Sequence, residues 1–184
     1  KKYKESGYNI IFVPLQKNGG VDVGKLFDLI DKDVAFISII HVSNETGAIN
    51  DIEHITKQAK EINPNILVHS DGVQAVGKVN IDLSKLGVDF YTISAHKIKG
   101  PKGIGGLFIS NPNKLKPFIL GGGQEMNFRS GTENTPAIFA FKSALENLKK
   151  IDYTLYKKEI LDNLNTDYYL VSKDNCVDNI ISIC

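Results

Sequence analysis

The sequence predicts an α/β fold built on a mainly parallel β-sheet. Apolar, strand-like runs alternate with helical patterns along the chain, and no repeat or low-complexity segment interrupts them. One run, residues 34–42, is apolar almost throughout, as expected of a parallel strand that is covered on both faces.

The individual elements follow from local patterns. We expect strands at residues 9–13, 34–42, 66–69, 88–94 and 105–110. We expect helices at residues 23–32, 51–62, 134–150 and 153–164. Asn50 or Asp51 can cap the second of these helices. Residues 112–123 are rich in Pro, Asn and Gly and predict a loop with one short helix, and two short strands are expected near 167–172 and 178–184.

Length and composition limit the possible classes of protein. The chain has 184 residues, which we divide into one domain at 1–133 and a linking helix with an incomplete small C-terminal domain at 134–184. The net charge of +1 gives no reason to expect nucleic acid or an anionic membrane as partner, and no apolar run reaches membrane-spanning length. The chain does not begin with Met, so we expect it to be cut from a longer protein.

The two cysteines, Cys176 and Cys184, show no CxxC or metal-ligand spacing, so no metal site is expected. So few cysteines suit a reducing compartment, which predicts a cytoplasmic protein, with an organelle matrix also open.

The most informative segment is residues 94–103, in which glycine and proline closely follow a lysine. Lys97 comes at the end of a predicted buried strand, beside the hydroxyl of Ser94 and the imidazole of His96. Burial disfavours the ammonium form, so such a lysine can be a neutral amine at about pH 7 and attack an aldehyde. This is the chemistry of the Schiff base of pyridoxal phosphate (PLP).

Polar side chains follow three consecutive predicted strands. They are Asn44 after the first strand, Asp71 and Gln74 after the second, and Ser94, His96 and Lys97 after the third. In open parallel sheets, ligands bind outside the carboxyl ends of the strands, so we expect these side chains to converge on one crevice.

Each of these residue types has a use in a PLP site. Asp71 could pair with the pyridine nitrogen and keep the ring an electron sink. Gln74 or Asn44 could bind the ring oxygen. Ser94 and His96 could hold the phosphate. Lys97 would carry the Schiff base and later act as a proton-transfer base.

Each residue also has a structural interpretation. Asp71 alone is more often a cap or turn residue, and Asn44 alone more often forms a turn. His41 and His69 lie in apolar strands and are expected to be hydrogen-bonded core residues. The functional interpretation therefore depends on the joint pattern at three strand ends.

The same residues resemble a known family. Segments 41–47, 69–78, 94–105 and 121–134 match it in order and spacing. The chain is similar to the central part of a cysteine desulfurase of the iron–sulfur-cluster type, in the class V aminotransferase group of fold-type I PLP enzymes. The Ser-Ala-His-Lys box that ends at Lys97 is widespread in that group. The Gly-Gly-Gly-Gln-Glu and Arg-Ser-Gly-Thr-Glu-Asn sequences within residues 121–134 point to the desulfurase branch.

The resemblance implies a three-layer PLP-transferase large domain followed by the start of a smaller α+β domain. It implies that Lys97 forms the Schiff base and that Asp71 is the pyridinium partner. It implies that Gln74 contacts the ring oxygen and that Asn44 lies near the ring and the substrate. It also implies that Ser94 and His96 bind the phosphate. It also implies that Thr132 reaches the phosphate of the partner subunit's cofactor, and therefore a homodimer with shared sites.

By the same resemblance, the sulfur-accepting cysteine and the arginine for the substrate carboxylate lie outside these residues. We interpret Cys176 and Cys184 as small buried residues, and neither as the nucleophile. The chain alone is therefore expected to be inactive.

The parent protein is expected to convert L-cysteine to L-alanine and to leave the sulfur as a persulfide on an enzyme cysteine. The sulfur would serve iron–sulfur cluster or thio-cofactor synthesis, through an acceptor or scaffold protein. Two alternatives stay open. One is a selenocysteine lyase or another class V aminotransferase. The other is a non-catalytic truncated scaffold that does not hold PLP.

Overall fold

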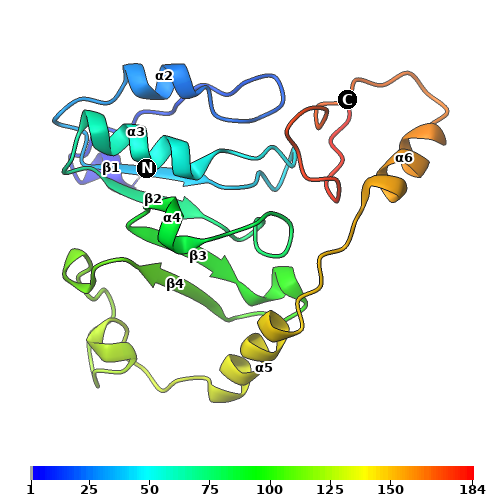
Figure 1. The fold of residues 1–184 in the computed structure, drawn as a ribbon. Helices are drawn as coiled ribbons and strands as arrows, with labels where there is room; N and C mark the ends of the chain where they lie inside the picture. Colours follow the sequence, from blue (N-terminus) through cyan, green and yellow to red (C-terminus); the bar gives the residue numbers. More distant parts are fainter. Residues whose placement is uncertain (1) are drawn as a thin grey trace.

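A four-stranded sheet with the strand order β1–β2–β3–β4 forms the centre of the protein (Figure 1). This computed structural model describes residues 2–184. The strands are β1 (Phe36–Ile40), β2 (Leu67–Asp71), β3 (Phe90–Ser94) and β4 (Gly105–Ile109). β1, β2 and β3 are parallel, and β4 pairs antiparallel to β3. The predicted α/β fold with a mainly parallel sheet is therefore confirmed.

One face of the sheet carries the main hydrophobic core. In β1, Ile37 and Ile39 are buried, whereas Phe36 is 51% exposed, because successive side chains of a strand point to opposite faces. Val68 of β2 and Tyr91 of β3 extend the buried face across the sheet. We expected the apolar run at residues 34–42 to be covered on both faces. Within the described residues, the strand that it forms is covered on one face only.

Three helices on this face each begin at an aspartate. They are α2 (Val23–Asp28), α3 (Ile52–Ile62) and α4 (Leu83–Leu86). The side chains of Asp22, Asp51 and Asp82 each accept a hydrogen bond from a backbone N–H in the first turn. Such caps satisfy donors that a helix start leaves unpaired. The helix predicted at residues 51–62 is confirmed, with Asp51 as its cap.

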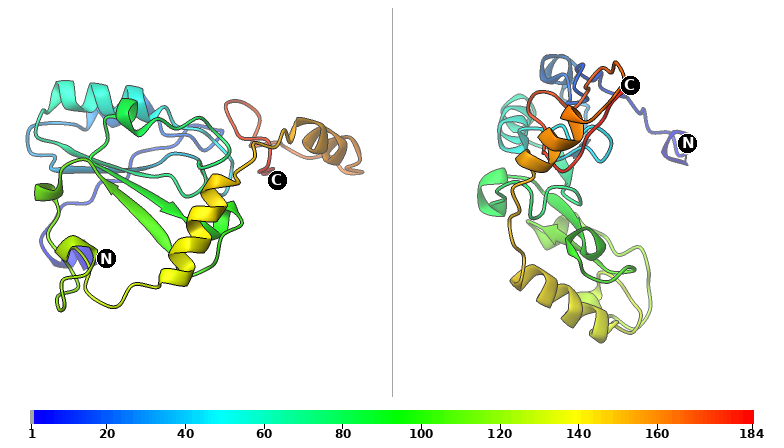
Figure 2. Two further views of the ribbon diagram at one scale, coloured as in Figure 1. Left: turned by 60° about the horizontal axis from the view of Figure 1, so that its bottom comes forward. Right: turned by 90° about the vertical axis from the view of Figure 1, so that its right-hand side faces the viewer.

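Helix α5 (Thr135–Glu146) packs against the short 3-10 helix η1 (Ala95–Ile98) that follows β3. Phe141 joins Ala95 and Ile98 in a second buried cluster, and Ile93 contacts both this cluster and the main core. Figure 2 accordingly has α5 on the same side of the sheet as α2, α3 and α4. The described residues therefore form a helical layer on one face of the sheet.

The remaining helices are short. They are α1 (Lys2–Glu5), η2 (Pro112–Lys114), η3 (Glu125–Asn127) and α6 (Thr154–Asp162). The 3-10 turn η2 is the short helix predicted in the loop at 112–123. Helix α6 confirms the helix predicted at 153–164.

The strand predicted at residues 9–13 is wrong. This segment has no regular secondary structure and is not paired with the sheet, and Phe12 is 85% exposed. The nearest regular pairing is an isolated antiparallel bridge between Leu15 and Val21. An apolar run becomes a strand only where a neighbouring strand satisfies its backbone, and within the described chain none lies beside this segment.

The two short strands predicted near the C-terminus reduce to one antiparallel bridge between Leu170 and Ile183. Backbone hydrogen bonds of 2.7 and 3.0 Å join Tyr169 and Cys184 beside it. The predicted pairing exists, but it is too short to form a sheet.

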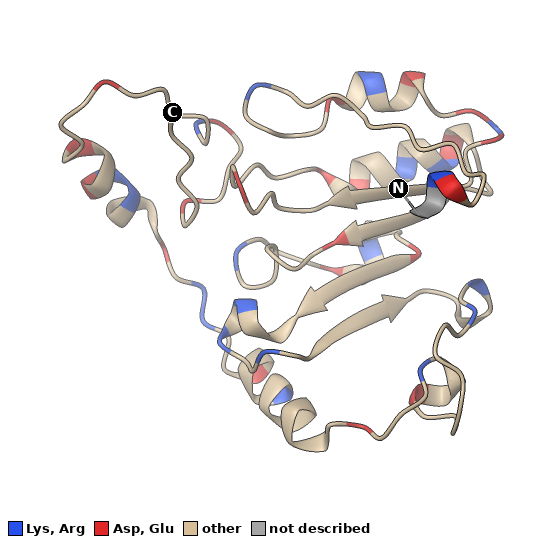
Figure 3. Cartoon of the chain, turned by 180° about the vertical axis from the view of Figure 1, so that it is seen from behind, with Lys and Arg blue, Asp and Glu red and all other residues tan. Residues whose placement is uncertain are grey.

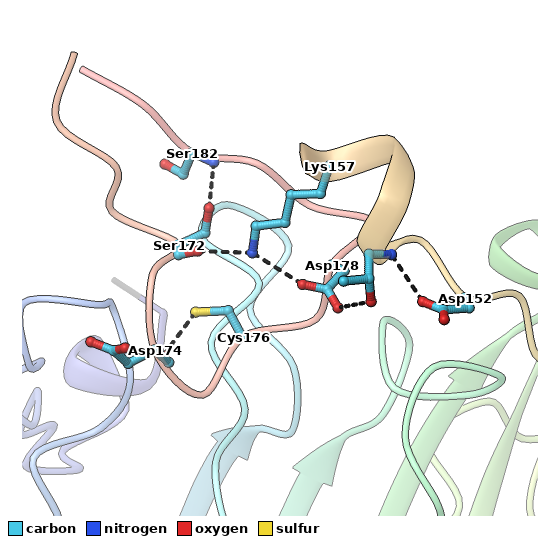
Figure 4. A network of polar contacts seen from close by, with 8 residues as sticks. Asp152, Lys157, Ser172, Asp174, Cys176, Asp178 and Ser182 are labelled. Carbon is cyan, nitrogen blue, oxygen red and sulfur yellow. Dashed lines mark hydrogen bonds and ion pairs between the residues drawn. The ribbon is translucent and has the colours of Figure 1, made fainter. Parts of the chain in front are cut away.

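A polar network ties α6 to this C-terminal segment (Figure 4). The Lys157 side chain, only 12% exposed, forms an ion pair of 3.2 Å with Asp178 and donates to the backbone carbonyl of Ser172 at 3.1 Å. The buried Ser172 hydroxyl accepts in turn from the Ser182 N–H at 2.9 Å. These contacts hold a segment that has little regular secondary structure.

Acidic and basic residues are interspersed along the chain (Figure 3), in keeping with its net charge of +1. Among residues 2–184, no helix combines the length and the apolar character that crossing a membrane requires.

Candidate functional site

The carboxyl ends of β1, β2 and β3 meet at one edge of the sheet. In the parallel register, Ile40 lies opposite Asp71, and Asp71 lies opposite Thr92. Ser94, the last residue of β3, lies two positions further along. The loops that carry the predicted site residues of these three strands therefore leave the sheet from the same edge.

Asp71 ends β2 and is half-buried. Its Oδ1 accepts a hydrogen bond from the Val73 N–H at 2.9 Å, which holds the carboxylate at the strand end. Its negative charge affects the pKa values of two neighbours, Tyr91 and His69. Burial raises the pKa of the Tyr91 hydroxyl, and the Asp71 carboxylate raises it further. Burial lowers the pKa of His69, and the Asp71 carboxylate acts against that shift.

The two core histidines predicted from the sequence have hydrogen-bond partners. His41 is buried, and its Nδ1 lies 2.7 Å from the Tyr91 hydroxyl. His69 lies between Ser38 at 2.9 Å and Thr92 at 2.7 Å, so both of its ring nitrogens are engaged. The prediction that both are hydrogen-bonded is confirmed. Burial in the core is confirmed for His41 only, because His69 is half-buried and stacks on the exposed Phe36.

A run of turns after β2 brings Gln74 and Lys78 together. Backbone hydrogen bonds from Ala75 to Gly72 and from Lys78 to Ala75 wind residues 73–78 tightly. As a result, the Lys78 ammonium donates to Oε1 of Gln74. Sequence reasoning gave Lys78 no role, although its spacing of four residues from Gln74 was a signal that the two could meet on one turn.

The charge of Lys97 acts on this pair. Burial lowers the pKa of Lys78, and the positive charge of Lys97 lowers it further. Gln74 and Lys78 follow β2, and Lys97 follows β3, so these side chains come from two strand ends at one edge of the sheet.

Our expectation that Lys97 would be buried is wrong. Lys97 lies in η1, whose Ala95 and Ile98 are buried against α5, while His96 and Lys97 are exposed. A 3-10 turn directs residues three apart to the same side, so burying Ala95 and Ile98 turns the two residues between them outward. Within this chain, the amine of Lys97 is accessible rather than desolvated.

Ser94 and His96 form a direct contact. The Ser94 hydroxyl lies 2.8 Å from Nδ1 of His96, at the start of η1. Ser94 has one hydroxyl hydrogen. If that hydrogen is donated to Nδ1 of His96, the Nε2–H of the ring is left to bind an anion such as phosphate, and if the ring donates from Nδ1, the hydroxyl hydrogen is left for it. Gly100 then returns the chain toward η1, and its N–H donates to the Ala95 carbonyl at 2.9 Å.

Asn44 lies in the exposed loop after β1. The Ser43 hydroxyl accepts from the Thr46 N–H at 3.2 Å and shapes this turn. The C-terminal segment supports the same loop, since the Val177 N–H donates to the Gly47 carbonyl at 2.9 Å. Contacts across more than 120 residues of sequence thus hold the loop that carries Asn44.

Thr132 is exposed, in the loop between η3 and α5. Its role at a site that two copies of the chain share stays a prediction. Figure 1 shows that η2 and η3, which follow β4, lie at the opposite end of the strands from η1.

The two cysteines are less buried than we expected. Cys184 is exposed, and Cys176 is half-buried with its thiol donating to the Asp174 carbonyl at 3.2 Å (Figure 4). Burial raises the pKa of the Cys176 thiol, which makes the reactive thiolate scarcer.

The sheet, the strand-end residues and the sequence together define a class of protein. The profile of the aminotransferase class-V family matches residues 1–172, and the chain belongs to this family. The more particular resemblance to cysteine desulfurases is also confirmed. The chain is 44% identical, over 140 residues, to the cysteine desulfurase IscS of Dictyoglomus turgidum, covering 76% of this chain and 35% of that protein.

Solved structures agree on the fold. A NifS-like protein superposes with a TM-score of 0.86 at 36% identity, over 96% of this chain and 50% of its own. A structure of SspA in complex with cysteine also gives a TM-score of 0.86, at 30% identity, over 96% of this chain and 51% of its own. The chain thus spans between about a third and half of the length of these relatives.

Proposed function

We propose that this chain carries the PLP site of a cysteine desulfurase. The observation that supports the proposal is the register of the parallel strands. It places the end of β2 at Asp71 and the end of β3 at Ser94 on one edge of the sheet, with the Gln74–Lys78 pair and Lys97 in the segments that follow. An amine, a carboxylate and an amide donor, which Lys97, Asp71 and Gln74 supply, have the chemistry to hold PLP.

We assign each group to one part of the cofactor. Lys97 binds its aldehyde carbon, and Asp71 its pyridine nitrogen. Gln74 donates to the ring oxygen, with Asn44 near ring and substrate. The hydrogen-bonded Ser94 and His96 hold the phosphate, and Thr132 reaches the phosphate of the cofactor in a second copy of the chain.

When bound, PLP supplies an electron sink for charge that develops on the substrate. Asp71 would keep a proton on the pyridine nitrogen through its negative charge, and the Val73 N–H holds that carboxylate at the strand end. The exposed Lys97 amine would take up or deliver protons at the substrate carbon.

For the whole protein, we propose the conversion of L-cysteine to L-alanine, with the sulfur transferred to an enzyme thiol as a persulfide. The carbon–sulfur bond of cysteine breaks, the sulfur bonds to the thiol, and a proton replaces it on carbon, so atoms and electrons balance. The names of the IscS and SspA relatives support this substrate. We propose a homodimer that passes sulfur to an acceptor or scaffold protein, in the cytoplasm or an organelle matrix.

The first test is covalent binding of PLP. The purified chain is mixed with PLP, its visible absorbance is recorded, and the complex is reduced with borohydride and digested for mass spectrometry. We expect a visible band and a reduced pyridoxyl adduct on Lys97, and neither in Lys97→Ala. Lys57→Ala, at an exposed position of α3, is the control and should keep both. Absence of the band in the wild type, or its survival in Lys97→Ala, would overturn the proposal and favour a scaffold without PLP.

The second test separates the enzyme classes in the full-length protein. L-cysteine with dithiothreitol should give equal amounts of alanine and sulfide. A preference for selenocysteine with release of selenide would indicate a selenocysteine lyase. Formation of a keto acid would indicate an aminotransferase.

A further inference from the structure

The side-chain amide of Gln74 can bind a ring oxygen in only one of its two orientations. The NH2 group donates hydrogen bonds, and the carbonyl oxygen only accepts them. An anionic phenolic oxygen accepts, so it needs the NH2 group. If the amide turned over, two acceptors would face each other, which is unfavourable. Some neighbour therefore has to determine the orientation of this amide.

Lys78 has the chemistry to do so. A lysine ammonium has three donors and no acceptor, so it can bind only the oxygen of the Gln74 amide. The structure has this contact, from the Lys78 ammonium to Oε1 of Gln74. With its oxygen engaged, the amide directs Nε2 and its two hydrogens away from Lys78. Both side chains are half-buried, so water competes less for the bond than at an open surface.

The turn that carries Lys78 lies against the segment that follows α5. Gly77 has a φ of +78°, and an added Cβ there would lie 2.9 Å from a methyl group of Leu148. Phe141 of α5 packs on Ala95 of η1. The residues 141–148 therefore lie beside both the turn that carries Lys78 and the turn that carries Lys97.

We propose that Lys78 is a positioning residue, which orients the Gln74 amide so that its NH2 group faces the ring oxygen of the cofactor. This inference rests on the proposed PLP site and adds a residue to it. Lys78 itself does not touch the cofactor. It acts through Gln74, in the way that outer-shell partners orient the ligands of metal sites.

The pH dependence of the visible band measures this role without measuring activity. A hydrogen bond to the ring oxygen stabilises the negative charge on that oxygen. The bond matters most once the neighbouring nitrogen has lost its proton, because that proton no longer offsets the charge. Weakening that bond therefore raises the pH at which the band shifts. We expect Lys78→Met to raise the midpoint by roughly 0.5–1 pH unit, the size of one weakened hydrogen bond.

A double-mutant cycle separates positioning from the simple loss of a nearby charge. The midpoints are measured for the wild type, Lys78→Met, Gln74→Leu and the double variant, with Lys57→Met as a control that removes an exposed charge from α3. If Lys78 acts through Gln74, the midpoint shift caused by Lys78→Met in the Gln74→Leu background should be less than half of the shift that it causes in the wild type. An equal shift in both backgrounds would mean that only charge matters, and the proposal would be overturned.

A cofactor-free measurement covers the case in which Lys78→Met binds PLP too weakly. In the apo chain, the 15N–1H heteronuclear NOE of the Gln74 side-chain amide should be high and should fall in Lys78→Met. An unchanged NOE would overturn the positioning role. Absence of the band in the wild type would instead overturn the proposed PLP site, so the two failures can be told apart.

Discussion

A methyl group at Gly72 would collide with the core beneath the candidate site. An ideal Cβ there would lie 2.1 Å from Cε1 and Cζ of Tyr91 and 2.3 Å from its hydroxyl oxygen, far inside van der Waals contact. Tyr91 is 1% exposed, and its hydroxyl is bound to His41 at 2.7 Å. Gly72→Ala must therefore move the Tyr91 ring or the backbone that carries Asp71.

We expect Gly72→Ala to lower the free energy of unfolding by about 2–6 kcal/mol. Overpacking contributes about 1–3 kcal/mol, and the buried Tyr91–His41 contact, if it is left incomplete, about 1–3 kcal/mol more. Urea denaturation followed by circular dichroism measures the change through the transition midpoint. Because Asp71 moves with its neighbour, the affinity for PLP should fall as well.

The matched control is Gly24→Ala in α2. An ideal Cβ at Gly24 meets only the Asp22 carboxylate, at 3.5 Å, which is ordinary contact. Alanine favours a helix over glycine by up to about 1 kcal/mol, so this variant should be neutral or more stable. If Gly72→Ala unfolds within about 0.5 kcal/mol of the wild type, the reasoning from the Tyr91 contact is refuted.

Two further predictions concern buried charged and titratable groups. Burial alone would raise the pKa of Asp89, but hydrogen bonds from Lys114, a backbone N–H and Lys60 outweigh it and hold the pKa below 3.8. Asp89→Asn should therefore cost about 1.5–3 kcal/mol at neutral pH. The difference from the wild type should narrow as the pH falls from 3.8 toward the lower pKa of the folded state, because the unfolded state is protonated first. Equal stability at neutral pH would contradict this. Burial lowers the pKa of His41 below 6.5, against the opposing charge of a nearby aspartate, so the neutral ring stabilises the fold fully above pH 6.5. This contribution should decline below pH 6.5, by at most about 1.4 kcal/mol per pH unit, in urea titrations from pH 7 to 5. His41→Gln should remove that part of the slope, and an unchanged slope would exclude His41 as its source.

The site shows where reasoning from the sequence succeeds. Parallel strands must end at the same edge of the sheet, so a polar residue after each strand is enough to predict that Asp71 and Ser94 lie near each other. The structure confirms that the strand ends are in register. The assignment of each side chain to one part of PLP stays a prediction, as does the domain boundary at residue 133.

The errors have a common cause, because they concern burial. Lys97 was expected to be buried since it follows an apolar strand, yet the 3-10 turn directs it outward. Residues 9–13 were expected to form a strand, yet no neighbour in the described chain pairs with them. Burial and strand pairing depend on the segments that pack beside a residue in the folded chain. The local sequence does not determine which segments these are.

The sequence alone determined the order of the four strands of the sheet and of the helices between them, and the edge at which the polar residues gather. Both follow from local periodicity and from the fixed direction of parallel strands. Only the tertiary structure decided which side chains meet there. The contact of Lys78 with Gln74 depends on the geometry of one turn, and the packing of Phe141 on η1 and of Leu148 beside Gly77 joins segments distant in sequence. Such packing selects one rotamer and one turn geometry among several that the local sequence allows equally.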